Sequence, residues 1–194
     1  MVLTVMNKEK DFPIRKPTRL KTFDYSTSAA YFLTICTSER RKVLSQIVGD
    51  DVLGVPKNHT SRIADRNIPL VPKNVKLLPY GEIANKYIIQ LNHFYENIHV
   101  DTYVIMPNHI HILLWIGKCG SPGTSTPTRQ TSTVSHFVST FKRFCNKEYG
   151  RNIWQRGFYD HIIRCNEDCD EIKKYIYENP LKWYYDELYS GDIE

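Results

Sequence analysis

Two histidines separated by one residue are the residues in this chain best suited to chemistry. His109 and His111 lie in the segment MPNHIHILL, whose apolar and β-branched residues predict a strand. Because alternate residues of a strand project from the same face, both imidazoles point to one side and Ile110 points to the other. Two neighbouring neutral imidazoles form part of a metal site and need one more ligand from another element. The alternative is that both are half-buried residues of a sheet.

A tyrosine and an asparagine near the C-terminus form a second candidate group. Tyr175 and Asn179 stand four residues apart in EIKKYIYENP, a segment that predicts a helix ending before Pro180. Residues four apart share a helix face, and Glu171 lies one turn earlier on the same stripe. A phenol is a weak nucleophile near neutral pH, but it can attack a phosphate that a metal ion activates. Asn179 offers an amide oxygen as third ligand, while the alternative for Tyr175 is a packing role.

The elements that must position these groups follow from the hydrophobic pattern. Strands are expected where aromatic and β-branched residues gather, at 30–37, 101–106, 109–116 and 158–164. Helices are expected where apolar residues recur at three- and four-residue spacing, at 81–98, 134–149, 167–178 and 181–188. This order predicts an α+β fold of the ferredoxin-like or RRM-like class, an antiparallel sheet with helices packed on it.

The chain is expected to form one domain over residues 30–190. Residues 1–29 are polar and basic and predict an irregular N-terminal arm. Glycines and prolines in 48–74 indicate an inserted loop or hairpin, in which 73–78 pairs back onto 42–47. Residues 119–133 have the composition of a polar linker.

Composition narrows the class of protein. The net charge of +5 and a pI near 8.9 permit nucleic-acid binding without requiring it. No run of eighteen apolar residues and no signal-peptide core occur, so we expect a cytoplasmic protein without a membrane partner. The five cysteines are scattered and form no CxxC pair, which argues against a zinc ribbon.

Taken together, these segments resemble the single-tyrosine HUH transposases, a family that includes insertion-sequence transposases and the REP-associated tyrosine transposases. The resemblance rests on MPNHIHILL, WQRGFYDHIIR and YIYENP and extends over residues 30–185. It implies an HUH endonuclease core and Mg²⁺ or Mn²⁺ as cofactor. It also implies nicking and joining of hairpin-flanked single-stranded DNA, from REP-like or insertion-sequence ends, through a 5′-phosphotyrosine intermediate.

The same resemblance assigns roles to single residues. It implies that His109 and His111 are the HUH pair and that Tyr175 is the nucleophile. Asn179 occupies the position where insertion-sequence relatives place a glutamine that binds the metal. The Asn-Pro ending of YIYENP resembles the REP-associated branch more closely than the branch that ends in glutamine.

Other residues are candidates for contact with the site or with DNA. His161, in the last predicted strand, and Glu171 are candidate neighbours of the site. Basic residues that are candidates for phosphate contacts are Arg40, Arg41, Lys42, Lys142, Arg143, Arg156, Arg164, Lys173 and Lys174. Aromatic candidates for stacking on bases are Trp154, Phe158 and Tyr159.

Three other functions remain open at this point. They are a catalytically inactive RRM-like nucleic-acid-binding module, an HUH replication or mobilisation nuclease, and a metal-binding structural protein. A His-x-His strand together with a downstream tyrosine helix favours the transposase over the binding module and the structural protein. The short chain favours it over the replication or mobilisation nuclease, which is often larger. The sequence leaves both a monomer and a homodimer open, and with them attack by the tyrosine of either subunit.

Overall fold

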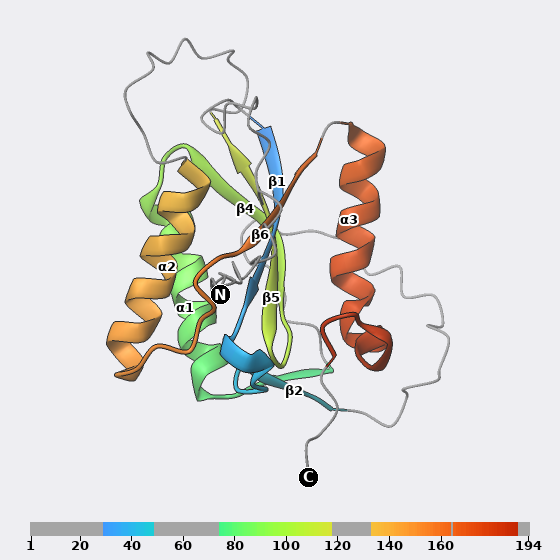
Figure 1. Ribbon diagram of the computed structural model, residues 1–194. Helices are drawn as coiled ribbons and strands as arrows, with labels where there is room; N and C mark the ends of the chain where they lie inside the picture. Colours follow the sequence, from blue (N-terminus) through green and yellow to red (C-terminus); the bar gives the residue numbers. More distant parts are fainter. Residues whose placement is uncertain (1–28, 49–73, 118–132, 164, 190–194) are drawn as a thin grey trace, which may run out of the picture.

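A four-stranded antiparallel sheet forms the centre of the computed structural model, which describes residues 29–48, 74–117, 133–163 and 165–189 (Figure 1). The strands lie in the order β4, β5, β1, β6, so β5 and β1 are the two central strands. Their bounds are β1 Ala29–Cys36, β4 Ile98–Ile105, β5 His109–Ile116 and β6 Tyr159–Ile163. Each neighbouring pair is antiparallel.

Helices cover both faces of this sheet. Helices α1 and α2 pack against each other on one face, and α3 lies on the other face against β4 and β5 (Figure 1). Their bounds are α1 Pro79–Phe94, α2 Thr133–Tyr149 and α3 Asn166–Glu178. The order of elements and of strands confirms the predicted ferredoxin-like α+β fold.

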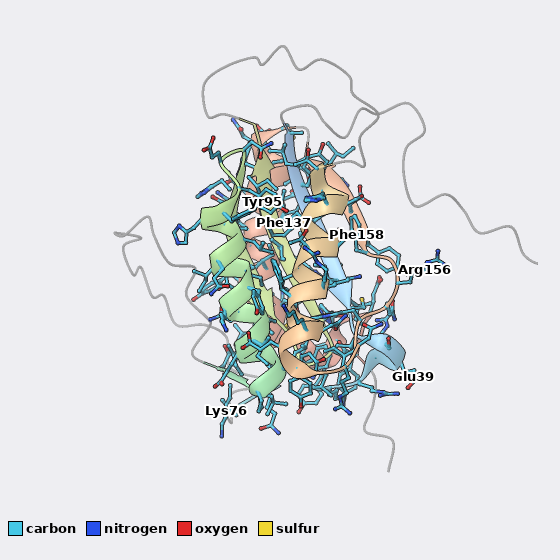
Figure 2. The ribbon with its side chains drawn as sticks, turned by 90° about the vertical axis from the view of Figure 1, so that its left-hand side faces the viewer. Glu39, Lys76, Tyr95, Phe137, Arg156 and Phe158 are labelled. Atoms are coloured by element: carbon cyan, nitrogen blue, oxygen red, sulfur yellow. The ribbon has the colours of Figure 1, made fainter. Side chains whose placement is uncertain are left out.

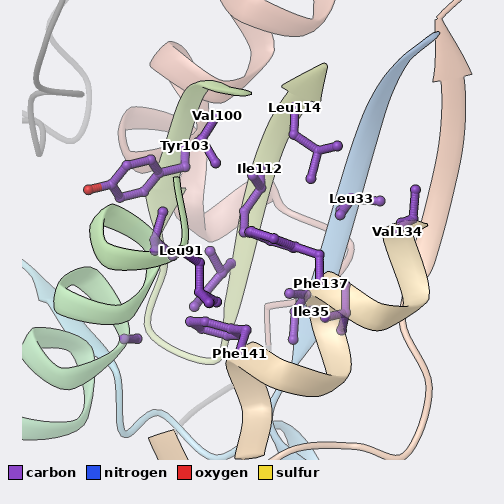
Figure 3. Close-up of a cluster of buried hydrophobic side chains, with 14 of the residues drawn as sticks. Leu33, Ile35, Leu91, Val100, Tyr103, Ile112, Leu114, Val134, Phe137 and Phe141 are labelled. Atoms are coloured by element: carbon purple, nitrogen blue, oxygen red, sulfur yellow. The ribbon is translucent and has the colours of Figure 1, made fainter. Parts of the chain in front are cut away.

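Alternation along β5 directs its side chains into two separate layers. Ile112 and Leu114 are fully buried beneath α1 and α2, where Phe137 of α2 packs against the same core (Figure 3). Each such aliphatic side chain contributes about 1.5–3 kcal/mol of transfer free energy when it leaves water. The histidines of β5 occupy the alternate positions, so they face α3. The core that anchors the strand therefore also fixes the direction of the imidazoles.

A small hairpin lies at one end of the sheet. Strand β2 (Ser45–Ile47) pairs with β3 (Val75–Leu77), which confirms the predicted pairing of 73–78 with 42–47. The following helix α1 starts so close to Leu44 that a Cβ atom at Gly81 would lie 1.9 Å from the Leu44 carbonyl oxygen. Because that oxygen accepts a hydrogen bond from the Leu78 N–H at 2.9 Å, it cannot easily move away. Only glycine fits at this contact.

The segment after α3 differs from the prediction. Instead of an α-helix over 181–188, Asn179–Tyr185 form the 3-10 helix η2, with non-helical backbone at Lys182. Pro180 has no N–H to donate to the carbonyl of Ile176, so α3 cannot continue through it with a full set of hydrogen bonds. The tighter winding turns the chain back, and Asp186 returns to α3.

Several predicted segments lie outside the described residues. They are the arm over 1–29, apart from its last residue, most of the insertion over 48–74, and the linker over 119–133, apart from its last residue. In the part of the chain that the structure does describe, no helix has the length and apolar character needed to span a membrane.

Candidate active site

Two imidazoles of β5 lie side by side on the sheet face that α3 covers. His109 Nε2 and His111 Nε2 are 3.0 Å apart, and the two ring centroids are 4.5 Å apart. The residues are 0% and 2% exposed. Strand periodicity predicts this shared direction, and the structure shows that the two Nε2 atoms also meet.

The other ring nitrogens have protein partners. Asn108 Nδ2 donates to the Leu188 carbonyl oxygen at 2.8 Å, which leaves Asn108 Oδ1 facing His109 Nδ1 at 2.8 Å. An amide oxygen only accepts, so Nδ1 of His109 carries the proton and Nε2 has a lone pair. His111 Nδ1 lies 2.9 Å from Thr34 Oγ1, which can accept its proton. In that tautomer both Nε2 atoms offer lone pairs to one point, as two metal ligands must.

Burial keeps both imidazoles neutral. It lowers the pKa of His109 to about 3, and the positive charge of Arg40 acts in the same direction. Burial also holds the pKa of His111 well below its ordinary value, with the His109 ring contributing. Arg40 lies in left-handed backbone (φ 55°), a conformation that costs a non-glycine residue roughly 1 kcal/mol or more. At neutral pH both imidazoles are therefore uncharged, and their Nε2 lone pairs can bind a cation.

Helix α3 brings Tyr175 to the histidine pair within the same chain. Tyr175 Oη lies 3.4 Å from His111 Nε2, and its ring contacts the rings of His111 and Phe32 at centroid distances of 5.2 and 5.9 Å. The buried Cys169 and Ile176 dock the helix on the sheet. Because successive helix residues point in different directions, docking Ile176 leaves Tyr175 at the margin of the interface, 44% exposed. The phenol is thus next to the imidazoles and open to a substrate.

The Tyr175 hydroxyl is protonated at neutral pH. Burial, and next the negative charge of Asp186, raise its pKa to about 12. Asp186 Oδ2 lies 3.5 Å from the hydroxyl oxygen and is an acceptor for it. The phenol therefore needs help to become a nucleophile, and a carboxylate stands beside it.

Asp186 is the site residue that the sequence analysis missed. One ligand atom each from His109, His111 and Asp186 can be chosen so that all lie within 4.8 Å of one another. Asp186 Oδ2 accepts a hydrogen bond from Asn179 Nδ2 at 2.7 Å, and Oδ1 accepts one from the Leu188 N–H at 2.6 Å. The position of Asp186 depends on the 3-10 turn η2, which no periodic sequence pattern predicts. The available signal was only an acidic residue seven positions after Asn179.

Asn179 is buried next to these three residues. It is 2% exposed, and its amide nitrogen holds Asp186, as described above. Its Oδ1 atom has no hydrogen-bond partner among the described residues. A buried amide oxygen without a partner suits a cation nearby, but the ligand role of Asn179 remains a prediction.

These residues fit a divalent metal ion. Two neutral imidazoles and a carboxylate are ligands that Mn²⁺ accepts readily, and the carboxylate also suits Mg²⁺. The buried, unpaired oxygen of Asn179 lies among the same residues. The set leaves coordination positions open, which a catalytic ion needs in order to contact its substrate.

An open cavity of about 680 Å³ adjoins the histidine pair. His111, Tyr175 and Asp186 form part of its wall, and Arg40 adds a positive charge. Other parts of the wall come from two exposed aromatic residues, Tyr159 and Tyr185. The cavity therefore combines the candidate chemical groups with charges of both signs and with aromatic faces on which bases can stack.

The two predicted neighbours of the site do not line this cavity. His161 lies on β6 and its Nε2 atom is 3.0 Å from Asp168 Oδ2, so its partner is a surface carboxylate. Glu171 is exposed on α3. The structure brings together His109, His111 and Tyr175 with Asn179 beside them, and leaves these two apart.

Several predicted phosphate contacts near the site already have partners. Lys42 Nζ lies 4.9 Å from the centre of the Tyr189 ring, and Arg41 pairs with Glu39. The two lysines of α3 face carboxylates: Lys173 lies 2.9 Å from Asp101 Oδ2 and Lys174 lies 4.0 Å from Glu178 Oε1. Exposed pairs of this kind contribute little and separate easily, so they leave these cations available. Arg164 lies outside the described residues.

The structure corrects the predicted exposure of two candidate DNA contacts. Trp154 is 3% exposed and its ring packs against Phe141 at a centroid distance of 5.4 Å, so neither face is open for a base to stack. Lys142 Nζ donates to the carbonyl oxygens of Gln155 and Gly157, so it holds the chain before β6 instead of lying free on the surface. The sequence did not reveal that this segment folds back on α2.

Comparison with known proteins assigns the chain to a family. The model of the family "Transposase IS200 like" matches residues 70–179, more than half of the chain. This range contains His109, His111, Tyr175 and Asn179, whereas Asp186 lies beyond it. An uncharacterised protein of Haemophilus influenzae is 28% identical over 190 residues, covering 90% of this chain and 93% of that protein.

Named relatives match over a shorter range. A putative REP-associated tyrosine transposase of Haemophilus influenzae is 30% identical over 43% of this chain and 50% of its own length. The REP-associated tyrosine transposase of Escherichia coli K12 is 30% identical over 43% of this chain and 44% of its own length. This chain therefore aligns with about half of each of these two proteins.

A solved structure supports the fold. A REP-associated tyrosine transposase bound to a REP hairpin superposes with a TM-score of 0.50 and 18% identity, covering 87% of this chain and 76% of that one. At that identity the likeness speaks for the architecture alone. With the family match over residues 70–179, the chain belongs to the IS200-like transposase family.

Proposed function

We propose that this protein is a metal-dependent enzyme that nicks and rejoins hairpin-flanked single-stranded DNA through a covalent bond to Tyr175. The observation that carries the proposal is the 3.4 Å distance between Tyr175 Oη and His111 Nε2 in one chain. The proposal draws its substrate from two relatives named REP-associated tyrosine transposases and from a solved one bound to a REP hairpin.

In this proposal, His109, His111 and Asp186 hold Mg²⁺ or Mn²⁺. The ion would polarise an oxygen of the scissile phosphate and so lower the barrier to attack. Asn179 has the role of orienting Asp186, through the hydrogen bond from its amide nitrogen. Asn108 and Thr34 keep the two imidazoles turned so that their Nε2 atoms converge.

The residues of the chain then carry out the transfer itself. Tyr175 Oη attacks phosphorus, and the bond between phosphorus and the 3′-oxygen of the preceding nucleotide breaks. The products are a 5′-phosphotyrosine and, after the leaving 3′-oxygen takes a proton from water, a free 3′-hydroxyl. The energy of the broken bond is therefore retained for rejoining. The phenol proton leaves toward Asp186 Oδ2, the acceptor 3.5 Å away. Arg40, at the cavity wall, stabilises the phosphate charge.

The experiment that tests this proposal compares two tyrosines of α3. A labelled single strand with a hairpin is incubated with Mn²⁺ and wild-type protein, and the products are separated on a denaturing gel. We expect a protein–DNA adduct in the wild type and in Tyr177→Phe. Tyr177 is 68% exposed and does not line the cavity. We expect no adduct with Tyr175→Phe, although that variant still binds DNA. An adduct of wild-type yield with Tyr175→Phe would show that another residue is the nucleophile.

A further inference from the structure

A second hollow lies on the opposite side of the sheet, between α2 and the segment 152–158 that leads into β6. Its volume is about 560 Å³, and Arg143 and Asn146 of α2 face Trp154, Arg156 and other residues of that segment across it. Figure 2 looks onto this side and shows Arg156 and Phe158 on the segment that runs beside α2. We call this hollow the α2 groove.

Two buried polar atoms of the α2 groove lack a partner among the described residues. They are Trp154 Nε1, which is a donor, and Asn146 Oδ1, which is an acceptor. The orientation of the Asn146 amide is set by its nitrogen, which donates to Asn152 Oδ1 at 3.1 Å. An unpaired buried donor or acceptor is unfavourable, so a ligand whose binding uncovers and pairs both atoms relieves that cost.

The charged side chains that line the α2 groove are all basic. They are Lys142, Arg143 and Arg156, and the residues lining it include no carboxylate. Lys142 uses two of its three hydrogens on the carbonyl oxygens of Gln155 and Gly157, at 2.8 and 2.7 Å. Burial lowers its pKa to about 8, which shows that its charge is only partly compensated. An anion in the groove would compensate it.

The start of β6 lies between the α2 groove and the cavity beside Tyr175. Phe158 lines the groove, and the next residue, Tyr159, lines the cavity. A single strand that leaves the cavity over Tyr159 therefore reaches the groove without crossing another element. A nucleotide offers both an anionic acceptor, its phosphate, and N–H donors on its base, which is the combination that the groove lacks.

We propose that the α2 groove is a second DNA-binding site that takes one nucleotide of the substrate strand outside the cleavage position. Its phosphate accepts hydrogen bonds from the basic side chains. Once the side chains of the groove shift to uncover them, Trp154 Nε1 donates to the same phosphate and Asn146 Oδ1 accepts from a base amino group. The proposal rests on the proposed function only in taking DNA as the ligand. Specificity for one base type at that nucleotide follows, because only a base with a donor at that edge satisfies Asn146.

Binding is tested on the Tyr175→Phe background, so that cleavage plays no part in the result. Fluorescence anisotropy measures the affinity for a labelled hairpin strand at several salt concentrations. We expect Arg143→Ala combined with Arg156→Ala to weaken binding about tenfold or more and to reduce the salt dependence, because phosphate contacts are lost. Lys147→Ala is the matched control, since this exposed lysine of α2 does not line the groove and should leave affinity unchanged.

The indole N–H of Trp154 provides a direct second readout. The chain has three tryptophans, so the ¹⁵N–¹H spectrum contains three indole signals, and Trp154→Phe identifies the one to follow. We expect this signal to shift when the hairpin strand binds. A stationary signal at saturation, or unchanged affinity in the double arginine variant, would overturn the groove proposal. Failure of wild-type protein to form an adduct, with these binding results intact, would instead overturn the proposed function alone.

Discussion

Each imidazole of the histidine pair has one nitrogen committed to a protein partner and the other directed at its neighbour. The partners, Asn108 and Thr34, come from the residue before β5 and from β1, so the orientation does not depend on a bound ion. Sequence spacing alone predicted that His109 and His111 share a face. It could not predict Asp186, because the contact of Asp186 with Asn179 joins residues across the 3-10 turn η2 and not along a helix face. At the residue scale, local periodicity is therefore predictable and side chains brought in by irregular turns are not.

The role of Asp186 can be separated from a general effect of charge. Asp186→Asn should lower the affinity for Mn²⁺ at least tenfold, because it removes an anionic ligand while keeping the shape of the side chain. Glu187→Gln removes the same charge one residue further along, from a residue that also lines the cavity, and should change affinity far less. Calorimetric titration of metal-free protein gives both values. Equal losses in the two variants would assign the effect to net charge and remove Asp186 from the ligand set.

Burial of the neutral histidines makes metal-free protein sensitive to acid. The pKa of His109 is about 3 in the native state and near 6.5 in the unfolded chain. Below pH 6.5 the unfolded chain therefore binds protons that the native state does not bind. The free energy of unfolding therefore keeps its maximum contribution from these histidines above pH 6.5. It falls as the pH drops, by up to about 1.4 kcal/mol per pH unit for each such histidine. Urea unfolding between pH 7 and 5, with chelator present, measures this slope.

The control for this slope is an exposed histidine. His99→Gln, in β4, should keep the wild-type slope, because it changes an exposed residue and leaves the buried pair intact. The double variant His109→Gln and His111→Gln should show a shallower slope. Identical slopes in all three proteins would mean that the pair is not the source of the acid sensitivity.

At the scale of elements, the site is held by two packing surfaces on opposite faces of one sheet. The hydrophobic spacing predicted the four strands and three main helices, since their apolar stripes are long and regular. The spacing wrongly predicted an α-helix after α3. Pro180 and the aromatic residues that follow it form a 3-10 helix there instead. The spacing also placed Trp154 at the surface, because nothing local shows that this residue bridges to Thr37 and packs under α2. Such long-range contacts are set by the whole fold.

Docking of α3 should govern both stability and activity. Ile176→Ala removes a side chain that is 2% exposed from the contact with the sheet and should lower the free energy of unfolding by about 2–5 kcal/mol. Because Tyr175 is its neighbour, the yield of DNA adduct should fall as well. Tyr177→Ala, on the exposed side of the same helix, should change stability by less than about 0.5 kcal/mol. Urea unfolding and adduct gels check both variants, and a fully active Ile176→Ala protein would contradict this view of α3.

At the scale of the whole molecule, one chain contains every group that the proposed reaction uses. Within the one chain that the structure describes, Tyr175 and the histidine pair meet without a second copy. The α2 groove lies on the other side of the sheet, and the start of β6 separates it from the cavity. In the proposed path the strand passes around this sheet edge. In this proposal, cleavage takes place on one face of the sheet and part of the DNA binding on the other.

Mixing two inactive variants tests whether the site is complete in one chain. Tyr175→Phe lacks the nucleophile and His109→Ala lacks a ligand, so each alone should form no adduct. If Tyr175 acts beside the histidines of its own chain, the mixture should stay inactive as well. An adduct that appears only on mixing would show that the tyrosine is donated to a neighbouring subunit.

The atom to which DNA becomes attached decides whether Tyr175 is the nucleophile. Wild-type protein is incubated with Mn²⁺ and a hairpin-bearing single strand, digested with nuclease and protease, and its peptides are analysed by mass spectrometry. The account predicts a nucleotide linked by its 5′-phosphate to the peptide that contains Tyr175, with loss of this product when a chelator is added. A nucleotide on any other residue, or the same yield on Tyr175 without a divalent ion, would contradict it.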